Sequence, residues 1–307
     1  RDTCYGERMN RLIIIQGATA SGKSSLALSL AKELKIPIIS ADSRQFYKEL
    51  SIGTAKPSDE ELSEAAHYFV NTHSIHELTI TSAGFMKSAR SKIKSLIAEG
   101  HQQIIVTGGS GMFIDALIDG LHPSPNDANV RQELDTIWKQ HGIEPLLKEL
   151  KIKDPETYNR IDTNNPMRIL RSLEIIKVSG KTIKEIREIP KEAIGLPLKR
   201  FSVAWKREDL YTRIDIRVDE MIAQGLFEEV KKLPLEKNLL LQNTVGYKEW
   251  IPYFNEKVSY KDTIALIQKN SRNYAKRQET WLRRYNDLIC LNPYERLSLK
   301  EQLLTHL

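Results

Sequence analysis

The order of apolar and polar positions predicts an α/β fold for the first and last parts of the chain. Apolar runs at 12–16, 36–39 and 103–107 each have the length of one buried strand. Apolar residues at helical spacing follow two of these runs, at 26–34 and 83–98. This alternation is typical of a parallel sheet with helices on its faces. Further strands are expected at 201–205 and 288–291.

The middle of the chain has a different pattern. A polar, proline-rich stretch at 121–127 marks a boundary. From there to about residue 189 the apolar spacing is helical and no strand pattern occurs, with helices expected at 131–140, 144–150, 166–178 and 182–188. We therefore predict a first core segment at 9–124, a helical insertion at 125–195 and a second core segment at 196–307.

Composition narrows the class of protein. The 307 residues are 40% hydrophobic and 28% charged, as in ordinary globular proteins, and no apolar run approaches the roughly 20 residues of a membrane span. Residues 1–10 carry no signal-peptide core, and Met9 is a candidate start. Cys4 and Cys290 lie too far apart in sequence for a zinc module or a disulfide scaffold, which suits a cytoplasmic protein. The net charge of +6 suggests an anionic partner only if the basic residues cluster.

A phosphate-binding motif follows the first strand directly. The motif G-x-x-x-x-G-K-[ST] is matched by Gly17, Ala18, Thr19, Ala20, Ser21, Gly22, Lys23 and Ser24. The two glycines let the backbone curl around an anion, and free N–H groups at the helix start point toward it. Lys23 adds a positive charge, and the Ser24 hydroxyl can bind Mg²⁺. The alternative, a glycine turn with an exposed lysine, does not explain why a strand and a helix flank the motif.

A second polar segment, Ser40–Gln45, follows the second apolar run. Because functional groups in parallel sheets lie where strands end, Asp42 is expected at the same edge as the phosphate loop. It could hold Mg²⁺, act as a general base for a second substrate, or cap the following turn.

The third strand lacks an expected acid. In many ATPases with this loop, an apolar strand ends in an aspartate that helps to hold magnesium. Here the strand ends in Thr107 and a glycine-rich loop, 108–111, that leads into another helix. This argues against simple ATP hydrolysis and leaves room for a different diphosphate.

Basic residues concentrate in two helical stretches. Arg213 and Arg217 lie four apart on a helix expected at 210–230, where nearby acids could neutralise them. The more basic stretch is 269–284, where Glu279 is the one acid and Tyr274 lies on the flank. A single cationic stripe suits a phosphate backbone better than a solvated face, which normally mixes signs. The basic residues of this stretch are Lys269, Arg272, Lys276, Arg277, Arg283 and Arg284.

Several of these segments together resemble the tRNA dimethylallyltransferase family. The matching segments run in family order over nearly the whole chain: 17–24, 39–45, 51–57, 108–111, 168–174, 179–182, 245–247 and 275–283. Ala18 replaces the usual proline and Ser110 the usual threonine, and neither change removes the relevant chemistry. The chain shows no Cys/His spacing for the zinc finger of eukaryotic members, so it resembles the bacterial type.

The resemblance implies transfer of a dimethylallyl group from dimethylallyl diphosphate to the exocyclic amine of the adenosine 3′ of the anticodon in tRNA. The phosphate loop would then hold this diphosphate and not ATP. Asp42 would be the general base, while Lys23, Arg217 and a Mg²⁺ ion on Ser24 would stabilise the leaving diphosphate.

The resemblance also implies a tRNA-binding set. The helical insertion would clamp the anticodon stem-loop, with the target base flipped into the site of a monomeric enzyme. The residues implied are Asp42, Ser43, Arg44, Gln45, Ser110, Arg131, Met167, Arg168, Ile169, Leu170, Arg171, Thr244, Val245, Gly246, Tyr247, Lys276, Arg277, Gln278, Trp281 and Arg283.

Three other functions fit parts of the sequence. A kinase acting on a nucleoside or small molecule would use the same loop with ATP. An enzyme that prenylates free adenine nucleotides would need no RNA-binding unit. A non-catalytic RNA-binding protein would need the basic stretch but not Asp42.

Overall fold

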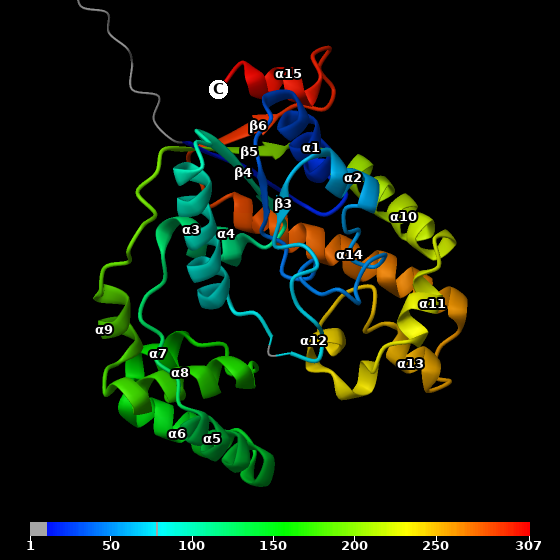
Figure 1. The fold of residues 1–307 in the computed structure, drawn as a ribbon. Helices are drawn as coiled ribbons and strands as arrows, with labels where there is room; N and C mark the ends of the chain where they lie inside the picture. The colour runs from blue at the N-terminus through cyan, green and yellow to red at the C-terminus, as the bar shows by residue number, and fades with distance from the viewer. Residues whose placement is uncertain (1–10, 78) are drawn as a thin grey trace, which may run out of the picture. The chain divides into compact units, whose positions relative to one another are not determined.

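A computed structural model describes residues 11–77 and 79–307. Within them, six parallel strands form one sheet in the order β3-β2-β4-β1-β5-β6 (Figure 1). The strands are β1 (Arg11–Gln16), β2 (Ile38–Ser40), β3 (His67–Tyr68), β4 (Gln103–Gly108), β5 (Leu198–Val203) and β6 (Leu288–Leu291). The strands expected near residues 12, 36, 103, 201 and 288 are all present, and the α/β fold class is confirmed.

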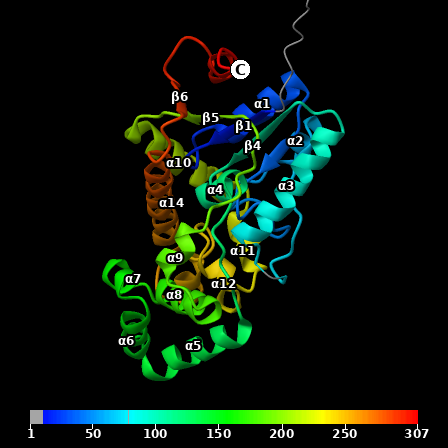
Figure 2. The same cartoon turned by 90° about the vertical axis from the view of Figure 1, so that its left-hand side faces the viewer.

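The alternation of side chains along β1 builds a core on each face of the sheet. Leu12 and Ile14 join one apolar cluster, whereas Ile13 and Ile15 join another that includes α1 and α15. Figures 1 and 2 show α1 and α15 on one side of the sheet and α3 and α4 on the other. The helices of this α/β unit are α1 (Lys23–Leu34), α2 (Asp59–Glu64), α3 (Ser82–Ala98), α4 (Gly111–Asp119), α10 (Arg207–Ala223), α11 (Leu226–Lys231), α12 (Leu239–Gln242), α13 (Trp250–Phe254), α14 (Tyr260–Leu282) and α15 (Leu299–Leu304), with a short 3₁₀ helix η1 (Leu235–Lys237).

The sheet order places the chemical segments at one edge. β1 pairs with β4, with Gln16 opposite Gly108, so the phosphate loop and the loop at 108–111 leave the sheet side by side. β4 also pairs with β2, with Thr107 opposite Ser40, which brings the segment containing Asp42 to the same edge. Gly108 makes this approach possible, because a Cβ there would lie 2.3 Å from the Ala41 carbonyl oxygen.

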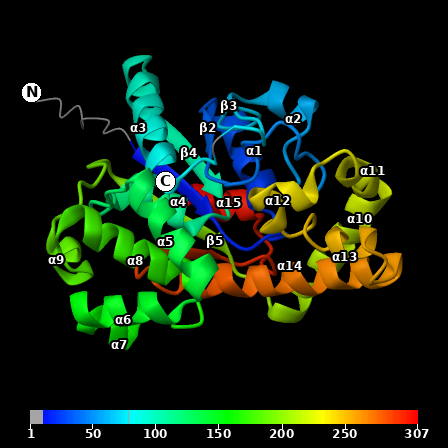
Figure 3. The same cartoon turned by 90° about the horizontal axis from the view of Figure 1, so that it is seen from below.

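The chain divides into two compact units. Residues Asp119–Ala193 form the helical unit, and the remaining described residues form the α/β unit. The sequence placed the insertion at 125–195; the contacts place its start six residues earlier and its end two residues earlier. Its helices, coloured green in Figure 3, are α5 (Ala128–His141), α6 (Glu144–Lys153), α7 (Pro155–Arg160), α8 (Pro166–Ser179) and α9 (Ile183–Glu188). They enclose a core of their own that contains Leu134, Leu150 and Leu173.

The sequence pattern did not predict two of the short elements, α7 and β3. α7 is six residues long and depends on a cap, with Asp154 accepting a hydrogen bond from the Thr157 amide at 3.0 Å. β3 is two residues long and exists through its pairing with β2. The expected strand at 201–205 instead begins at Leu198 and ends at Val203. Among the described residues, no helix is long and apolar enough to span a membrane.

Candidate active site

The phosphate loop curls between β1 and the first turn of α1. Ala20 and Gly22 both have left-handed backbone conformations, with φ of 60° and 90°, and α1 begins at Lys23. The Lys23 side chain is buried and donates to the Ala18 carbonyl oxygen at 3.2 Å. The loop therefore has the geometry that its sequence predicted, with the lysine folded across it.

Side chains from distant parts of the sequence hold this loop in shape. Gln278 on α14 accepts from the Thr19 amide at 2.8 Å and donates to the Gly109 carbonyl oxygen at 3.0 Å, which ties the two glycine-rich loops together. From α10, Arg213 donates to the Ala20 carbonyl oxygen at 2.9 Å. Because these contacts fix the loop before any ligand binds, little ordering remains when an anion enters.

Arg217, one turn after Arg213 on α10, points to the ligand side of the loop. Its guanidinium donates to the Thr19 hydroxyl at 3.2 Å, and it lines a cavity together with Lys23 and Asp42. The sequence left open whether the acids on α10 neutralise these arginines. One of them, Asp215, instead forms an ion pair with Arg272 of α14, which packs beside α10 (Figure 1).

Burial and charge lower the pKa of Lys23. Loss of solvent around the ammonium is the main cause, and repulsion by Arg217 adds to it, against an attraction from Asp42, so that the pKa falls from 10.5 to about 8. Burial also lowers the pKa of Arg217. A buried lysine beside a half-buried arginine is unfavourable without an anion, and an anion of high charge would relieve both cations.

We expect pyrophosphate binding to weaken as the pH rises above about 8, because Lys23 then loses the proton that the anion needs. The decline should approach about tenfold in affinity per pH unit for one coupled proton. Isothermal titration calorimetry between pH 6.5 and 9.5 measures it. Lys23→Gln is the control, because it keeps the titration of the ligand and removes that of the lysine. A wild-type profile parallel to that of Lys23→Gln would contradict the prediction.

Asp42 both caps a turn and faces the cavity. One carboxylate oxygen accepts from the Arg44 amide at 3.0 Å, so the capping role is real. The residue also lines the cavity that contains Lys23 and Arg217. The cap uses one oxygen atom, which leaves the other available for chemistry.

The residues after Asp42 are fixed by loops from elsewhere in the fold. The Ser43 amide donates to the Ser110 hydroxyl at 3.0 Å, and Arg44 Nε donates to the Thr244 hydroxyl at 2.7 Å. Gln45 is buried and accepts from the Ser40 hydroxyl at 3.1 Å. The segment is therefore rigid, as a site that positions two substrates requires.

Two cavities meet at the phosphate loop. One, of about 270 Å³, extends from Lys23 past Asp42 to Thr244 and Tyr274. The other, of about 560 Å³, extends along Ser58 and Glu220. They share walls formed by Lys23, Ser24, Gln45, Thr107 and Arg217. Ligands in the two cavities could thus contact the same cations.

The site suits magnesium bound through a ligand and not by a cage of acids. Among the described residues, no group of three or more His, Cys, Asp or Glu side chains could hold a metal. Ser24 is exposed in the first turn of α1 and lines both cavities. Mg²⁺ commonly keeps several waters and binds through substrate phosphates with few protein ligands, so the residues present fit it.

The structure shows which side chains of the predicted tRNA-binding set are exposed and which are buried. Met167, Arg168, Lys276, Arg277 and Arg283 are exposed, as a binding surface requires. In contrast, the side chains of Ile169, Leu170 and Tyr247 are fully buried. Ile169 and Leu170 belong to the core of the helical unit, so their side chains offer no surface to RNA.

Tyr247, Gln278 and Trp281 have structural partners. The Tyr247 hydroxyl donates to Glu229 at 2.6 Å, Gln278 ties the two loops, and Trp281 Nε1 donates to Asp115 at 3.1 Å. Glu229 also accepts from the Ile52 amide at 2.8 Å and so holds the loop at 51–53. No sequence signal distinguishes Glu229, because it looks like any acid on a helix surface.

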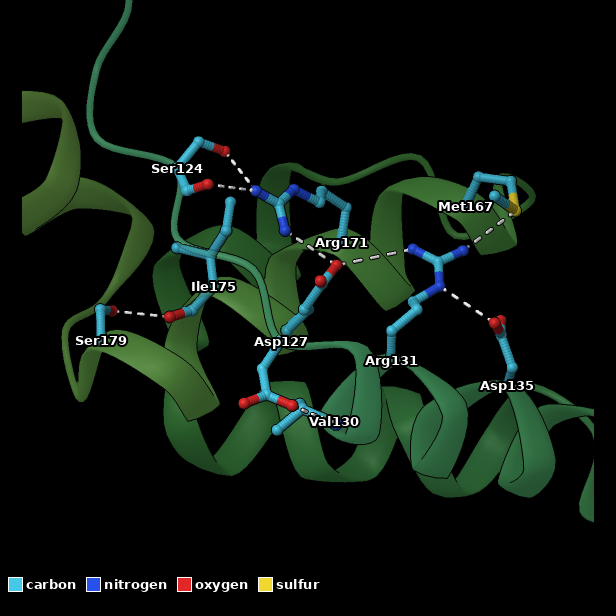
Figure 4. A network of polar contacts seen from close by, with 10 residues as sticks. Ser124, Asp127, Val130, Arg131, Asp135, Met167, Arg171, Ile175 and Ser179 are labelled. Atoms are coloured by element: carbon cyan, nitrogen blue, oxygen red, sulfur yellow. Dashed lines mark hydrogen bonds and ion pairs between the residues drawn. The ribbon is translucent and has the colours of Figure 1, made fainter. Parts of the chain in front are cut away.

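Two arginines of the predicted set share one buried acid within the helical unit. Glu174 of α8 is 4% exposed and lies 2.8 Å from Arg171 and 3.7 Å from Arg131. Figure 4 shows these two arginines close together. Arg131 also contacts Asp135, and Arg171 donates to the Ser124 carbonyl oxygen at 2.7 Å. The two guanidinium groups are therefore held side by side.

A phosphate loop at the end of a parallel sheet, with a buried lysine, a half-buried arginine and a nearby carboxylate, defines the class of P-loop proteins. The family model described as IPP transferase matches residues 45–285. The chain belongs to the tRNA dimethylallyltransferase family.

Relatives cover nearly the full chain. A tRNA dimethylallyltransferase from Christiangramia forsetii is 41% identical over 90% of this chain and 91% of its own length. One from Bacteroides thetaiotaomicron is 36% identical over 97% and 98%.

Solved structures of tRNA-modifying transferases are similar to this chain. A tRNA isopentenylpyrophosphate transferase from Bacillus halodurans superposes with a TM-score of 0.66 at 32% identity, covering 92% of this chain and 90% of that one. A eukaryotic dimethylallyltransferase acting on tRNA superposes with a TM-score of 0.81 at 26% identity, covering 92% of this chain and 74% of that one.

Proposed function

We propose that this enzyme transfers the dimethylallyl group of dimethylallyl diphosphate to the exocyclic amine of the adenosine 3′-adjacent to the tRNA anticodon. The enzyme is a prenyltransferase that modifies tRNA, as its family membership states. The observation that carries the finer proposal is the single cavity in which the Asp42 carboxylate faces Lys23 and Arg217. One end of this cavity suits a diphosphate, and the other offers a base to a weak nucleophile.

The reaction needs the diphosphate site at one end of the cavity and the base at the other. The lone pair of an exocyclic adenine amine is delocalised into the ring, so a base that removes its proton during attack helps the reaction. As the new C–N bond forms, the bond from the allylic carbon to the diphosphate oxygen breaks and negative charge grows on the diphosphate. Lys23, Arg217 and the loop amides are arranged to receive that charge. Mg²⁺ on Ser24 would neutralise part of it.

The helical unit and α14 supply the tRNA contacts in this proposal. Lys276 and Arg277 are exposed cations in the last turns of α14, Arg283 is one directly after it, and Arg168 is one at the start of α8. Such residues bind phosphates and set the register of the RNA, while the pocket selects the base.

The direct test incubates the full chain with dimethylallyl diphosphate, Mg²⁺ and unmodified tRNA, followed by nuclease digestion and mass spectrometry. We expect isopentenyladenosine beside the anticodon and release of diphosphate. Equal prenylation of AMP would favour the free-nucleotide activity, and transfer of phosphate from ATP to a nucleoside would favour a kinase. No product, with an active control enzyme, would refute the proposal.

We expect Glu174→Gln to raise the KM for tRNA and leave kcat at saturating tRNA unchanged, because Arg131 and Arg171 lose the charge that positions them. The stability of the chain should fall by about 1–3 kcal/mol, since charged hydrogen bonds inside the unit are lost. Steady-state kinetics and urea unfolding measure both effects.

Glu133→Gln is the matched control in the same unit. Glu133 pairs with Lys177 at the surface, where such pairs contribute about 0–1 kcal/mol. An unchanged KM in Glu174→Gln would show that the Glu174 charge does not position the two arginines for tRNA.

A further inference from the structure

Thr107 has a buried hydroxyl with no hydrogen-bond partner. The residue is 9% exposed, and among the described residues its Oγ1 is one of few buried side-chain atoms left unpaired. A buried hydroxyl that gives up water without gaining a partner destabilises the fold, so most such groups in native proteins are paired. Neither the general-base role of Asp42 nor the charge stabilisation by Lys23 and Arg217 uses it.

The strand geometry places the Thr107 side chain on the face of the sheet that α1 covers. Ile105, two residues earlier on β4, packs in the cluster that contains Leu26 and Leu30 of α1. Because side chains alternate along a strand, Thr107 lies on the same face, nearer the N-terminal end of α1. It is part of the wall, shared by both cavities, that includes Lys23 and Ser24.

The position also has a counterpart in the general P-loop architecture. β4 is the hydrogen-bonded neighbour of β1, whose end carries the phosphate loop. In P-loop NTPases, the magnesium is held by the Ser or Thr of the loop together with an aspartate from a strand end. Here the neighbouring strand presents a neutral hydroxyl at that end.

We propose that the Thr107 hydroxyl bonds a water molecule of the Mg²⁺ that Ser24 binds, in place of the usual aspartate. This rests on the proposed function, in which a magnesium diphosphate occupies the loop. Mg²⁺ sheds its waters reluctantly, so a partner that reaches a bound water is enough to position it. A neutral partner leaves the charges of Lys23 and Arg217 free for the diphosphate, whereas a second carboxylate beside them would cancel part of their attraction.

The test compares Thr107→Val, which keeps the shape and removes the hydroxyl, with Thr107→Ser, which keeps the hydroxyl. Calorimetry on the full chain measures inorganic pyrophosphate binding with Mg²⁺ and with EDTA. We expect Thr107→Val to weaken binding about 10-fold with Mg²⁺ and to leave binding in EDTA unchanged. Thr107→Ser should bind within about threefold of wild type under both conditions. Thermal unfolding checks that both variants fold.

Binding of Mn²⁺ in the pyrophosphate complex, followed by electron paramagnetic resonance, gives a second readout. Here Thr107→Val should release the metal at lower chelator concentration than Thr107→Ser. Equal loss with and without metal, wild-type behaviour of Thr107→Val, or no magnesium-dependent pyrophosphate binding in wild type would each overturn the inference. The proposed function fails separately, if wild-type protein binds magnesium pyrophosphate and does not prenylate tRNA.

Discussion

Replacing Asp42 by Asn should lower kcat for tRNA prenylation about 10²–10⁴-fold while tRNA binding is retained. Asparagine keeps an oxygen that can accept the hydrogen bond from the Arg44 amide, so the turn survives. What it loses is the negative charge that accepts a proton from the attacking amine. Single-turnover kinetics with saturating dimethylallyl diphosphate, beside filter-binding measurements of the tRNA Kd, separate the two effects.

Asp59→Asn is the control for Asp42→Asn. Asp59 is an exposed acid in the first turn of α2, and its replacement should leave both rate and affinity unchanged. An Asp42→Asn enzyme with wild-type kcat would show that Asp42 only caps the turn and is not the general base. Loss of tRNA binding together with activity would assign it a recognition role and not a chemical one.

Arg217→Gln should lower kcat/KM for dimethylallyl diphosphate about 10²–10³-fold, the range for losing one donor to a charge that develops in the transition state. The arginine lines both cavities together with Lys23, so its charge acts on the same anion. The pKa of Lys23 should rise in this variant, because the repulsion from Arg217 disappears. The decline of pyrophosphate affinity with pH would then begin at a higher pH than in wild type.

Arg207→Gln supplies the comparison on the same helix. Arg207 is exposed at the start of α10, and its loss should change neither kcat/KM nor the pH profile. If Arg217→Gln matched Arg207→Gln in both measurements, the leaving diphosphate would not depend on Arg217.

The sequence predicted the elements that local chemistry defines. The apolar run at 12–16, two glycines at fixed spacing and a helical pattern at 26–34 each act over a few residues, so β1, the loop and α1 were foreseeable. The same holds for α8, where Asn165 caps the first turn and Gly180 ends the last. Parallel strands that end at one edge also placed Asp42 near the loop without any coordinates.

Tertiary contacts decided the rest, because a side chain's partners depend on which distant segment packs against it. The pattern along α14 predicted one cationic stripe, yet packing against α10 pairs Arg272 with Asp215 and turns Gln278 inward to the phosphate loop. Ile169 and Leu170 fell within a matching segment, and only the fold of the helical unit showed them to be core residues.

The chain by itself therefore determined five of the six strands that the structure describes, the phosphate loop and the identity of the charged groups at its edge, since these follow from periodicity and spacing along the backbone. The structure alone decided that the buried Lys23 and the half-buried Arg217 line one cavity with Asp42, and that the Thr107 hydroxyl lacks a partner. Burial and pairing depend on segments far apart in the sequence, such as those of Thr19 and Gln278, which lie 259 residues apart and are hydrogen-bonded. No local pattern encodes them.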